Sequence, residues 1–123
     1  MSPASERLPQ RGENWWTQFP TDPPGKTPRP VIVVSTNGRN NHPRATTVLV
    51  IPLSTSIHKL APGQVLLRSG ETGLQTDSAA LADNLCVVCR SELTEPVRGH
   101  RPVSNTQICR LAELVWIAIG CVG

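Results

Sequence analysis

Two runs of β-branched residues constrain the fold of this chain more than any other feature. The first, Arg29-Pro-Val-Ile-Val-Val-Ser35, places four consecutive Val and Ile residues behind a proline. The second, Thr46-Thr-Val-Leu-Val-Ile-Pro-Leu-Ser-Thr-Ser56, ends in a group of hydroxyls. Apolar runs bounded by turn-forming residues are typical of strands buried on both faces. Pro30 suits the first position of a strand, because that residue need not donate a ladder hydrogen bond. If the two strands pair, Arg29 and the hydroxyls lie at one rim.

Shorter segments complete a mostly-β pattern. Further strands are predicted at 14–19, 61–68, 78–82 and 85–89, with turn-rich loops at 20–28, 36–44 and 69–77. A helix is expected to begin at Ser104, which has capping-box spacing to Gln107, and to end at Gly120. Its apolar stripe consists of Ile108, Leu111, Ala112, Val115 and Ile119. The pattern predicts a small, mostly-β barrel capped by this helix, with Leu114 and Trp116 outside the stripe and available to a second subunit.

The length of 123 residues predicts a single domain. The polar residues 1–11 are expected to form a flexible N-terminal tail, and residues 12–123 the domain. A formal charge of +3 and a pI near 8.9 are compatible with a polyanionic partner without indicating one. No apolar run reaches membrane-spanning length, and the N-terminus has no signal-peptide pattern, so we expect a cytoplasmic protein with no membrane partner.

The two adjacent tryptophans must face opposite sides of the first strand. The simpler interpretation places one ring, of Trp15 or Trp16, in the core and the other on a surface or partner interface. A platform on which RNA bases stack is the alternative.

Four cysteines allow two interpretations. Cys86-Val-Val-Cys89 has the spacing of a metal knuckle or redox pair, and Cys109 and Cys121 could complete a zinc site with His100. However, residues three apart on a strand point to opposite faces and cannot chelate one ion. Buried reduced thiols are therefore favoured over a metal site or disulfide.

The order and spacing of five sequence features resemble the MazF/PemK family of ribonuclease toxins. An Arg-Pro pair opens a Val/Ile strand, an Asn-containing loop follows, and the next strand ends in Pro-Leu-Ser-Thr-Ser56. Upstream, Gly12-Glu-Asn-Trp-Trp-Thr-Gln-Phe19 is similar to the family's opening strand, and downstream Ala80-Leu-Ala-Asp-Asn84 is similar to its Leu-x-Asp-Gln segment. The resemblance covers roughly residues 12–120. It implies an SH3-like barrel of the MazF/CcdB type that forms a homodimer with an RNA groove along its interface.

The resemblance also implies a function. The chain is expected to be a sequence-selective, metal-independent endoribonuclease toxin that needs no cofactor. It would cleave single-stranded mRNA by attack of a ribose 2′-hydroxyl on the adjacent phosphate, inhibit translation and growth, and be neutralised by a cognate antitoxin. Such a reaction needs a base, an acid and stabilisation of the charge that develops on the phosphate.

The residues that match the family motifs are the candidate site. Arg29 is the expected charge stabiliser, because a guanidinium stays ionised and binds phosphate oxygens bidentately. Ser54 stands where the family usually has threonine, and Asp83 stands at a position that assists RNA binding or cleavage in some relatives. A turn cap remains the structural alternative for Asp83, which is expected to be partly desolvated, and His58 is a second candidate base. The expected substrate-binding residues are Lys26, Arg39, Thr55, Ser56 and His58.

Two departures from the family pattern leave rival interpretations open. The glutamate that the family usually carries shortly before its arginine is absent, since Lys26 and Thr27 precede Pro28. Serine at position 54 lacks the methyl group that fixes a threonine rotamer. The rivals are a degenerate relative that no longer cuts RNA and a binding module of the same fold, such as a CcdB-like gyrase poison.

Overall fold

The computed structural model describes residues 7–19, 22–23, 25, 27–57, 59–98 and 101–120. Seven strands form the antiparallel sheet, in the order β4-β5-β3-β2-β1-β7, with β6 pairing with β3 off this path. The strands are β1 (Asn14–Thr17), β2 (Arg29–Val33), β3 (Thr47–Ser54), β4 (Gln64–Leu67), β5 (Ser78–Leu81), β6 (Cys86–Cys89) and β7 (Leu93–Pro96). The helices are α2 (Asn37–Asn40), α3 (Ser69–Thr72) and α4 (Asn105–Ile119), with 3-10 turns at Ala82–Asn84 and Arg90–Glu92.

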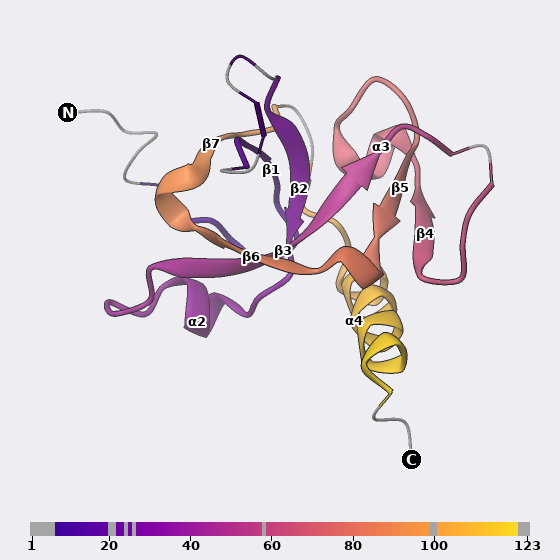
Figure 1. Cartoon of the computed structure of the whole chain (residues 1–123). Coiled ribbons are helices and arrows are strands. Elements are labelled where there is room, and N and C mark those ends of the chain that lie inside the picture. Colours follow the sequence, from indigo (N-terminus) through magenta and orange to yellow (C-terminus); the bar gives the residue numbers. More distant parts are fainter. Residues whose placement is uncertain are drawn as a thin grey trace.

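The long strand β3 joins two parts of the sheet. Its first half pairs with β6, its end pairs with β5, and β2 lies along its other edge. In Figure 1, β3 runs across the molecule from the side of α2 to that of α3, with β4 and β5 on one side and β1, β2 and β7 on the other. Among the described strands no ladder joins β4 to β7, so the predicted barrel is open there. The mostly-β prediction with a terminal helix is confirmed.

Strand β2 is buried on both faces, as its sequence predicts. Val31 and Val33 pack with Trp15 in one apolar cluster, and Ile32 packs in a second cluster with Ile108 of α4. Trp15 is 1% exposed, whereas the neighbouring Trp16 is only half-buried. One ring in the core and the other at the surface is therefore confirmed.

Helix α4 begins and ends where the sequence predicts. The Ser104 hydroxyl accepts a hydrogen bond from the Gln107 N–H at 3.3 Å, and Gly120 takes the left-handed φ of +84°. The apolar stripe is buried only in its first half, because Ile119 is 68% exposed at the end that projects beyond the sheet (Figure 1). Leu114 is half-buried against the chain's own core, whereas Trp116 is 60% exposed, and their contact with a second subunit stays a prediction.

Two predicted loops contain single-turn helices. Thr36 caps α2 by accepting the Arg39 N–H, and α3 ends at Gly73, whose φ is +79°. Four-residue helices leave too short a pattern to detect at loop positions rich in Asn, Gly and Ser. Strand β7 was also absent from the sequence prediction, because Leu-Thr-Glu-Pro has one buried residue and ends in a proline.

The N-terminal boundary differs from the prediction. Arg11, assigned to a flexible tail, donates its backbone N–H to Asn37 at 2.6 Å and its guanidinium to the Val34 carbonyl at 3.0 Å. Pro9 is buried. Residues 7–11 therefore pack on the domain, while residues 1–6 lie outside the described part of the chain. The remainder of the predicted division, a domain continuing to residue 123, stays a prediction.

Candidate functional site

The expected rim of Arg29 and hydroxyls exists as a pocket. Val31 pairs with Pro52, and continuing that register by two residues brings Arg29 opposite Ser54. Both side chains line a cavity of about 360 Å³ between β2, the end of β3 and β5. We call this cavity the arginine pocket; its other lining residues are Pro30, Pro52, Leu53, Thr55, Ser78, Leu81 and Asn84. Two residues 25 positions apart in the sequence thus face one space.

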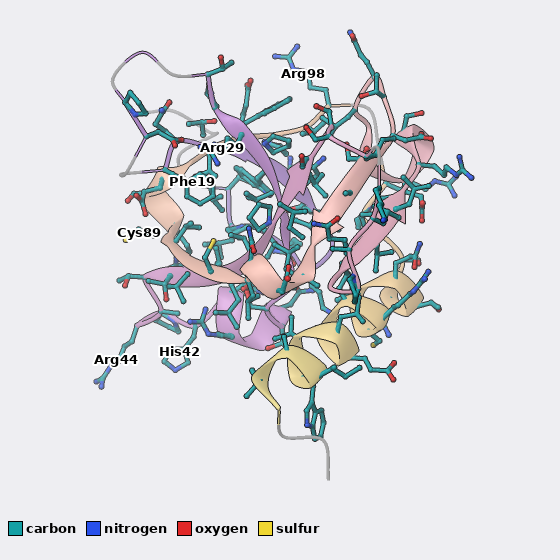
Figure 2. All side chains as sticks on the ribbon, turned by 45° about the vertical axis from the view of Figure 1, so that its right-hand side comes forward. Phe19, Arg29, His42, Arg44, Cys89 and Arg98 are labelled. Atoms are coloured by element: carbon teal, nitrogen blue, oxygen red, sulfur yellow. The ribbon has the colours of Figure 1, made fainter. Side chains whose placement is uncertain are left out.

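The Arg29 guanidinium is held from the preceding loop. Its Nη2 donates to Asp22 Oδ1 at 2.7 Å, and its Cζ lies 5.5 Å from the centre of the Phe19 ring. Figure 2 shows Arg29 and Phe19 together on one side of the molecule. The Asp22 side chain is 5% exposed and that of Arg29 is 43% exposed, so the guanidinium keeps an open side. The loop before Arg29 therefore does contain a carboxylate that pairs with it. This carboxylate, of Asp22, lies seven residues upstream rather than immediately before the arginine.

The Ser54 hydroxyl is oriented by its own strand end. It accepts the backbone N–H of Ser56 at 3.1 Å. A hydroxyl that accepts a hydrogen bond still carries its own hydrogen, which can donate to a group in the arginine pocket. Thr55 and Ser56 are both exposed, and Thr55 also lines a second cavity.

Two residues of this pocket were not singled out in the sequence. Asn84 ends the 3-10 turn after β5, and Ser78 opens β5. The Ser78 hydroxyl is fully buried and has no hydrogen-bond partner among the described residues. The pairing of Ser54 with Ala79 places this segment beside the hydroxyl cluster, and that register was not available from the sequence.

Asp83 does not line the arginine pocket. Its side chain is exposed, so the expected partial desolvation is wrong. The carboxyl lies over Gly63, where an added Cβ would meet Asp83 Cγ at 2.7 Å and Oδ2 at 2.8 Å. Its neighbour Asn84 is the residue of this turn that reaches the pocket wall.

Arg39 lies at the far end of β3. Its guanidinium donates to the Thr47 carbonyl at 2.7 Å and to the Thr47 hydroxyl at 3.1 Å. Thr47 begins β3 and Ser54 ends it, a separation of roughly 23 Å at the usual rise of a strand. His42 and Arg44 of the same loop project from the side of the molecule away from Arg98 in Figure 2. The expected substrate-binding residue Arg39 therefore is not part of the pocket, and Lys26 and His58 lie outside the described residues.

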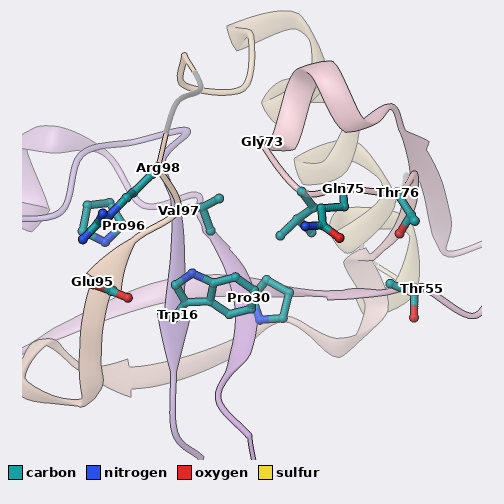
Figure 3. Close-up of a pocket in the computed structure, with 11 residues that line it drawn as sticks. Trp16, Pro30, Thr55, Gly73, Gln75, Thr76, Glu95, Pro96, Val97 and Arg98 are labelled. Atoms are coloured by element: carbon teal, nitrogen blue, oxygen red, sulfur yellow. The ribbon is translucent and has the colours of Figure 1, made fainter.

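A second cavity adjoins the arginine pocket (Figure 3). Its volume is about 560 Å³, and Trp16 and Pro30 form one side of it. The remaining lining residues are Thr55, Gly73, Leu74, Gln75, Thr76, Glu95, Pro96, Val97 and Arg98. Pro30 and Thr55 line both spaces, so the two cavities are neighbours. We call this space the tryptophan pocket.

The described cysteines are free thiols rather than a disulfide. Cys86 is half-buried, but Cys89 and Cys109 are exposed, so the prediction of buried thiols is wrong for these two; Cys121 lies outside the described residues. Hydrogen bonding to Glu92 raises the pKa of the Cys89 thiol, and burial raises that of Cys86. Across the described ranges, no three His, Cys, Asp or Glu side chains gather as metal ligands would. None of the described helices has the length and apolar character to cross a membrane.

Comparisons with known proteins identify relatives over most of the chain. Residues 10–115 match the family described as PemK-like, MazF-like toxin of type II toxin-antitoxin system. The chain is 35% identical over 116 residues to Endoribonuclease MazF9 of Mycobacterium tuberculosis (strain ATCC 25618 / H37Rv), covering 85% of this chain and 88% of the relative.

Solved structures have the same fold. MazF from Deinococcus radiodurans superposes with a TM-score of 0.72 at 19% identity, covering 94% of this chain and 99% of that one. An endoribonuclease in complex with its cognate antitoxin, from a mycobacterial species, superposes with a TM-score of 0.70 at 22% identity, covering 94% and 98%. These likenesses confirm the predicted MazF-like fold.

Proposed function

Because the chain belongs to the PemK-like, MazF-like toxin family of type II toxin-antitoxin systems, we propose that it is a sequence-selective endoribonuclease whose active site is the arginine pocket. The observation that carries this proposal is the convergence of Arg29 and Ser54 on one cavity. The substrate is single-stranded RNA, with mRNA as the cellular target. The 35% identical relative, itself named an endoribonuclease, supports the enzymatic assignment over a gyrase poison of the same fold.

The reaction is a transesterification within the RNA. A ribose 2′-oxygen forms a bond to the adjacent phosphorus, the bond from phosphorus to the 5′-oxygen of the next nucleotide breaks, and a cyclic phosphate and a 5′-hydroxyl result. The 2′-hydroxyl proton passes to a base, and the departing 5′-oxygen receives a proton. Since the nucleophile belongs to the substrate, this chemistry does not require a metal-activated water.

Arg29 supplies the charge that this transition state needs. Asp22 holds one nitrogen of the guanidinium, and the side that remains exposed donates to the phosphate oxygens as negative charge builds on them. Ser54, whose hydroxyl accepts from Ser56, donates its hydrogen to the phosphate or to the leaving oxygen. Both groups are positioned before substrate binds, which lowers the reorganisation cost in the transition state.

The proton acceptor is proposed to be Asp83. Asp83 precedes Asn84, which lines the arginine pocket, and its carboxylate is exposed and therefore accessible to an RNA strand that extends beyond the pocket. Thr55 and Ser56, exposed beside Ser54, are proposed to contact the RNA backbone, with Lys26 and His58 as further contacts from segments outside the described residues.

We further propose that the protein acts as a homodimer in the cytoplasm and is neutralised by a cognate antitoxin. The structure of a mycobacterial relative with its own antitoxin supports the second statement. The exposed end of α4 supports the homodimer. Three apolar side chains there, Trp116, Ile117 and Ile119, are 60%, 53% and 68% exposed. Large apolar side chains gathered at one helix end are typical of a protein interface.

The test is cleavage of a long mixed-sequence RNA in excess EDTA, with mapping of the 5′ ends. We expect discrete cuts by the parent and at least about a thousandfold slower cleavage by Arg29→Ala, in line with the loss of a main electrostatic group. Ser54→Ala should slow cleavage about tenfold to a hundredfold, and Ser54→Thr should retain activity. Arg68→Ala, which removes an exposed arginine that pairs with Asp77, is the matched control. Equal rates for the parent and Arg29→Ala would refute the proposed site.

A further inference from the structure

The tryptophan pocket is built on one face of the sheet. Trp16 pairs with Pro30 of β2 on one side and with Glu95 of β7 on the other. Directly opposed residues of an antiparallel pair point to the same face, with their Cβ atoms about 5 Å apart. An indole ring, a proline ring and a carboxylate therefore lie in a row, and the indole is half-buried with one part open to the cavity.

The opposite wall is a fixed segment rather than a loose loop. It consists of residues 73–76, which follow α3. The Asn14 side-chain amide donates to the Thr72 carbonyl at 2.9 Å, and the Thr72 hydroxyl accepts the Leu74 N–H at 3.2 Å. The volume of about 560 Å³ lies in the range of preformed small-molecule sites, roughly 300–1,000 Å³.

Polar groups stand at the edges of this apolar surface. Glu95 and Arg98 lie on the β7 side, and Gln75 and Thr76 lie on the opposite wall (Figure 3). An aromatic plane with a few polar groups around it is the arrangement that binds a flat nucleobase, by stacking on its face and hydrogen bonding to its edge. An apolar peptide side chain would leave these polar groups without partners.

We propose that the tryptophan pocket binds the nucleobase next to the cleaved bond, and that Glu95 makes it select a base with an exocyclic amino group. The proposal rests on the proposed function, because Pro30 and Thr55 line both pockets, so that a base in the tryptophan pocket would neighbour a phosphate held at Arg29. A carboxylate only accepts hydrogen bonds. It therefore favours the amino edges of cytosine, adenine and guanine over uracil, which presents carbonyl oxygens on both sides of its N3–H.

Stacking and edge recognition make separable contributions. The Trp16 ring interacts with every base through its face, and Glu95 discriminates among bases through their edges. Arg98, at the mouth of the pocket, adds positive charge for the backbone of the strand. Selectivity at this position is thus assigned to one exposed residue, which can be changed without opening the core.

The first experiment maps the cuts of the parent, Glu95→Gln and Glu113→Gln on one mixed RNA. In the parent, we expect a base with an amino group at one position beside the cut, with uracil cleaved about tenfold more slowly or worse. Glu95→Gln replaces an acceptor-only group by an amide that also donates, so uracil should be cleaved within about threefold of the other bases. Glu113→Gln, an exposed change on α4, should leave the preference as it is. An unchanged preference in Glu95→Gln would overturn the proposal.

The second experiment measures binding and does not depend on cleavage. Fluorescence anisotropy compares a labelled ten-nucleotide oligocytidylate with the matching oligouridylate, both added to the full chain carrying Arg29→Ala. We expect cytidylate to bind about tenfold more tightly, and Glu95→Gln to remove the difference. Trp16→Leu keeps an apolar side chain and should weaken both oligomers about tenfold through lost stacking. Equal binding of both oligomers before any change at Glu95, or no effect of Trp16→Leu, would overturn the proposal.

These outcomes separate the proposal from the proposed function. A parent chain that cuts no RNA but prefers oligocytidylate, with the preference lost in Glu95→Gln, would refute the ribonuclease and keep the base-binding pocket. A parent that cuts RNA with uracil freely accepted beside every cut would keep the ribonuclease and refute the role of Glu95.

Discussion

The pairing of Asp22 with Arg29 gives the sharpest prediction, because the carboxylate has opposite effects on binding and on catalysis. Asp22→Asn keeps the shape and one acceptor oxygen, so the 2.7 Å contact becomes a hydrogen bond from Arg29 to a neutral amide. Because the guanidinium keeps its charge, the hydrogen bond remains charge-assisted, and the difference between the two chains is the lost attraction between opposite charges. Since the Arg29 side chain is 43% exposed, solvent reduces the difference, and we expect a loss of about 1 kcal/mol.

Asp22→Asn is expected to change both KM and kcat. Removing a negative charge beside the guanidinium should strengthen phosphate binding and lower KM. A weaker tether should let Arg29 leave its position over the Phe19 ring, and displacements of about 1 Å at a reacting group lower rates by up to about a hundredfold. We therefore expect kcat to fall about tenfold in Asp22→Asn while KM also falls. A purely structural role for Asp22 would lower the amount of folded enzyme and leave KM unchanged.

A double-mutant cycle isolates the pair. Unfolding in urea is measured for the parent, Asp22→Asn, Arg29→Gln and the double variant. Independent residues give additive changes within about 0.3–0.5 kcal/mol, whereas a coupling near 1 kcal/mol is expected here. Additive stabilities together with an unchanged kcat in Asp22→Asn would refute the view that this carboxylate positions the catalytic arginine.

Substitutions at four further positions test other parts of the structure. Ser78→Ala removes a buried hydroxyl that has no partner in the described part of the chain, and it should raise the free energy of unfolding by about 1 kcal/mol in urea titrations. Ser35→Ala removes a buried hydroxyl that bonds to Asn40 and should lower the free energy of unfolding by about 1–2 kcal/mol. Changes of the same sign in the Ser78 and Ser35 variants would contradict this prediction. Ser104→Ala should lower thermal stability by about 1 kcal/mol through loss of the α4 cap, with Ser104→Asp restoring most of it; equal melting of all three chains would refute the cap. Gly63→Ala places a Cβ 2.7 Å from a carboxyl carbon of the adjoining turn and should cost about 1–3 kcal/mol, and a circular-dichroism melt equal to the parent's would show that the turn moves freely.

The sequence predicted the parts of the fold that depend on continuous or periodic patterns. The run from Val31 to Val33 identified a strand buried on both faces, and Ser104 with Gly120 bounded α4 correctly. It did not predict α2, α3 or β7, each only four residues long, because so short an element is specified by its capping contacts and its neighbours in space. The cap of α2 and the wall formed after α3 depend on such contacts.

The site was predictable where it follows from strand pairing. Arg29 and Ser54 were expected at one rim because two strands begin and end there, and their register brings them together. Asp22 was missed because its distance from Arg29 along the chain is set by the path of a proline-rich loop. Arg39 was predicted to bind substrate because it lies in a polar loop. The sequence gives no sign that its guanidinium is instead bound to Thr47.

The two departures from the family pattern no longer favour a degenerate, inactive relative. A carboxylate is present at Arg29, since Asp22 lies within 2.7 Å of the guanidinium even though no acid immediately precedes the arginine. The rotamer that threonine would fix through its methyl group is instead restrained at Ser54 by the Ser56 N–H. Neither departure by itself therefore argues that the chain is inactive, because a contact within this chain holds the Arg29 guanidinium and another holds the Ser54 hydroxyl.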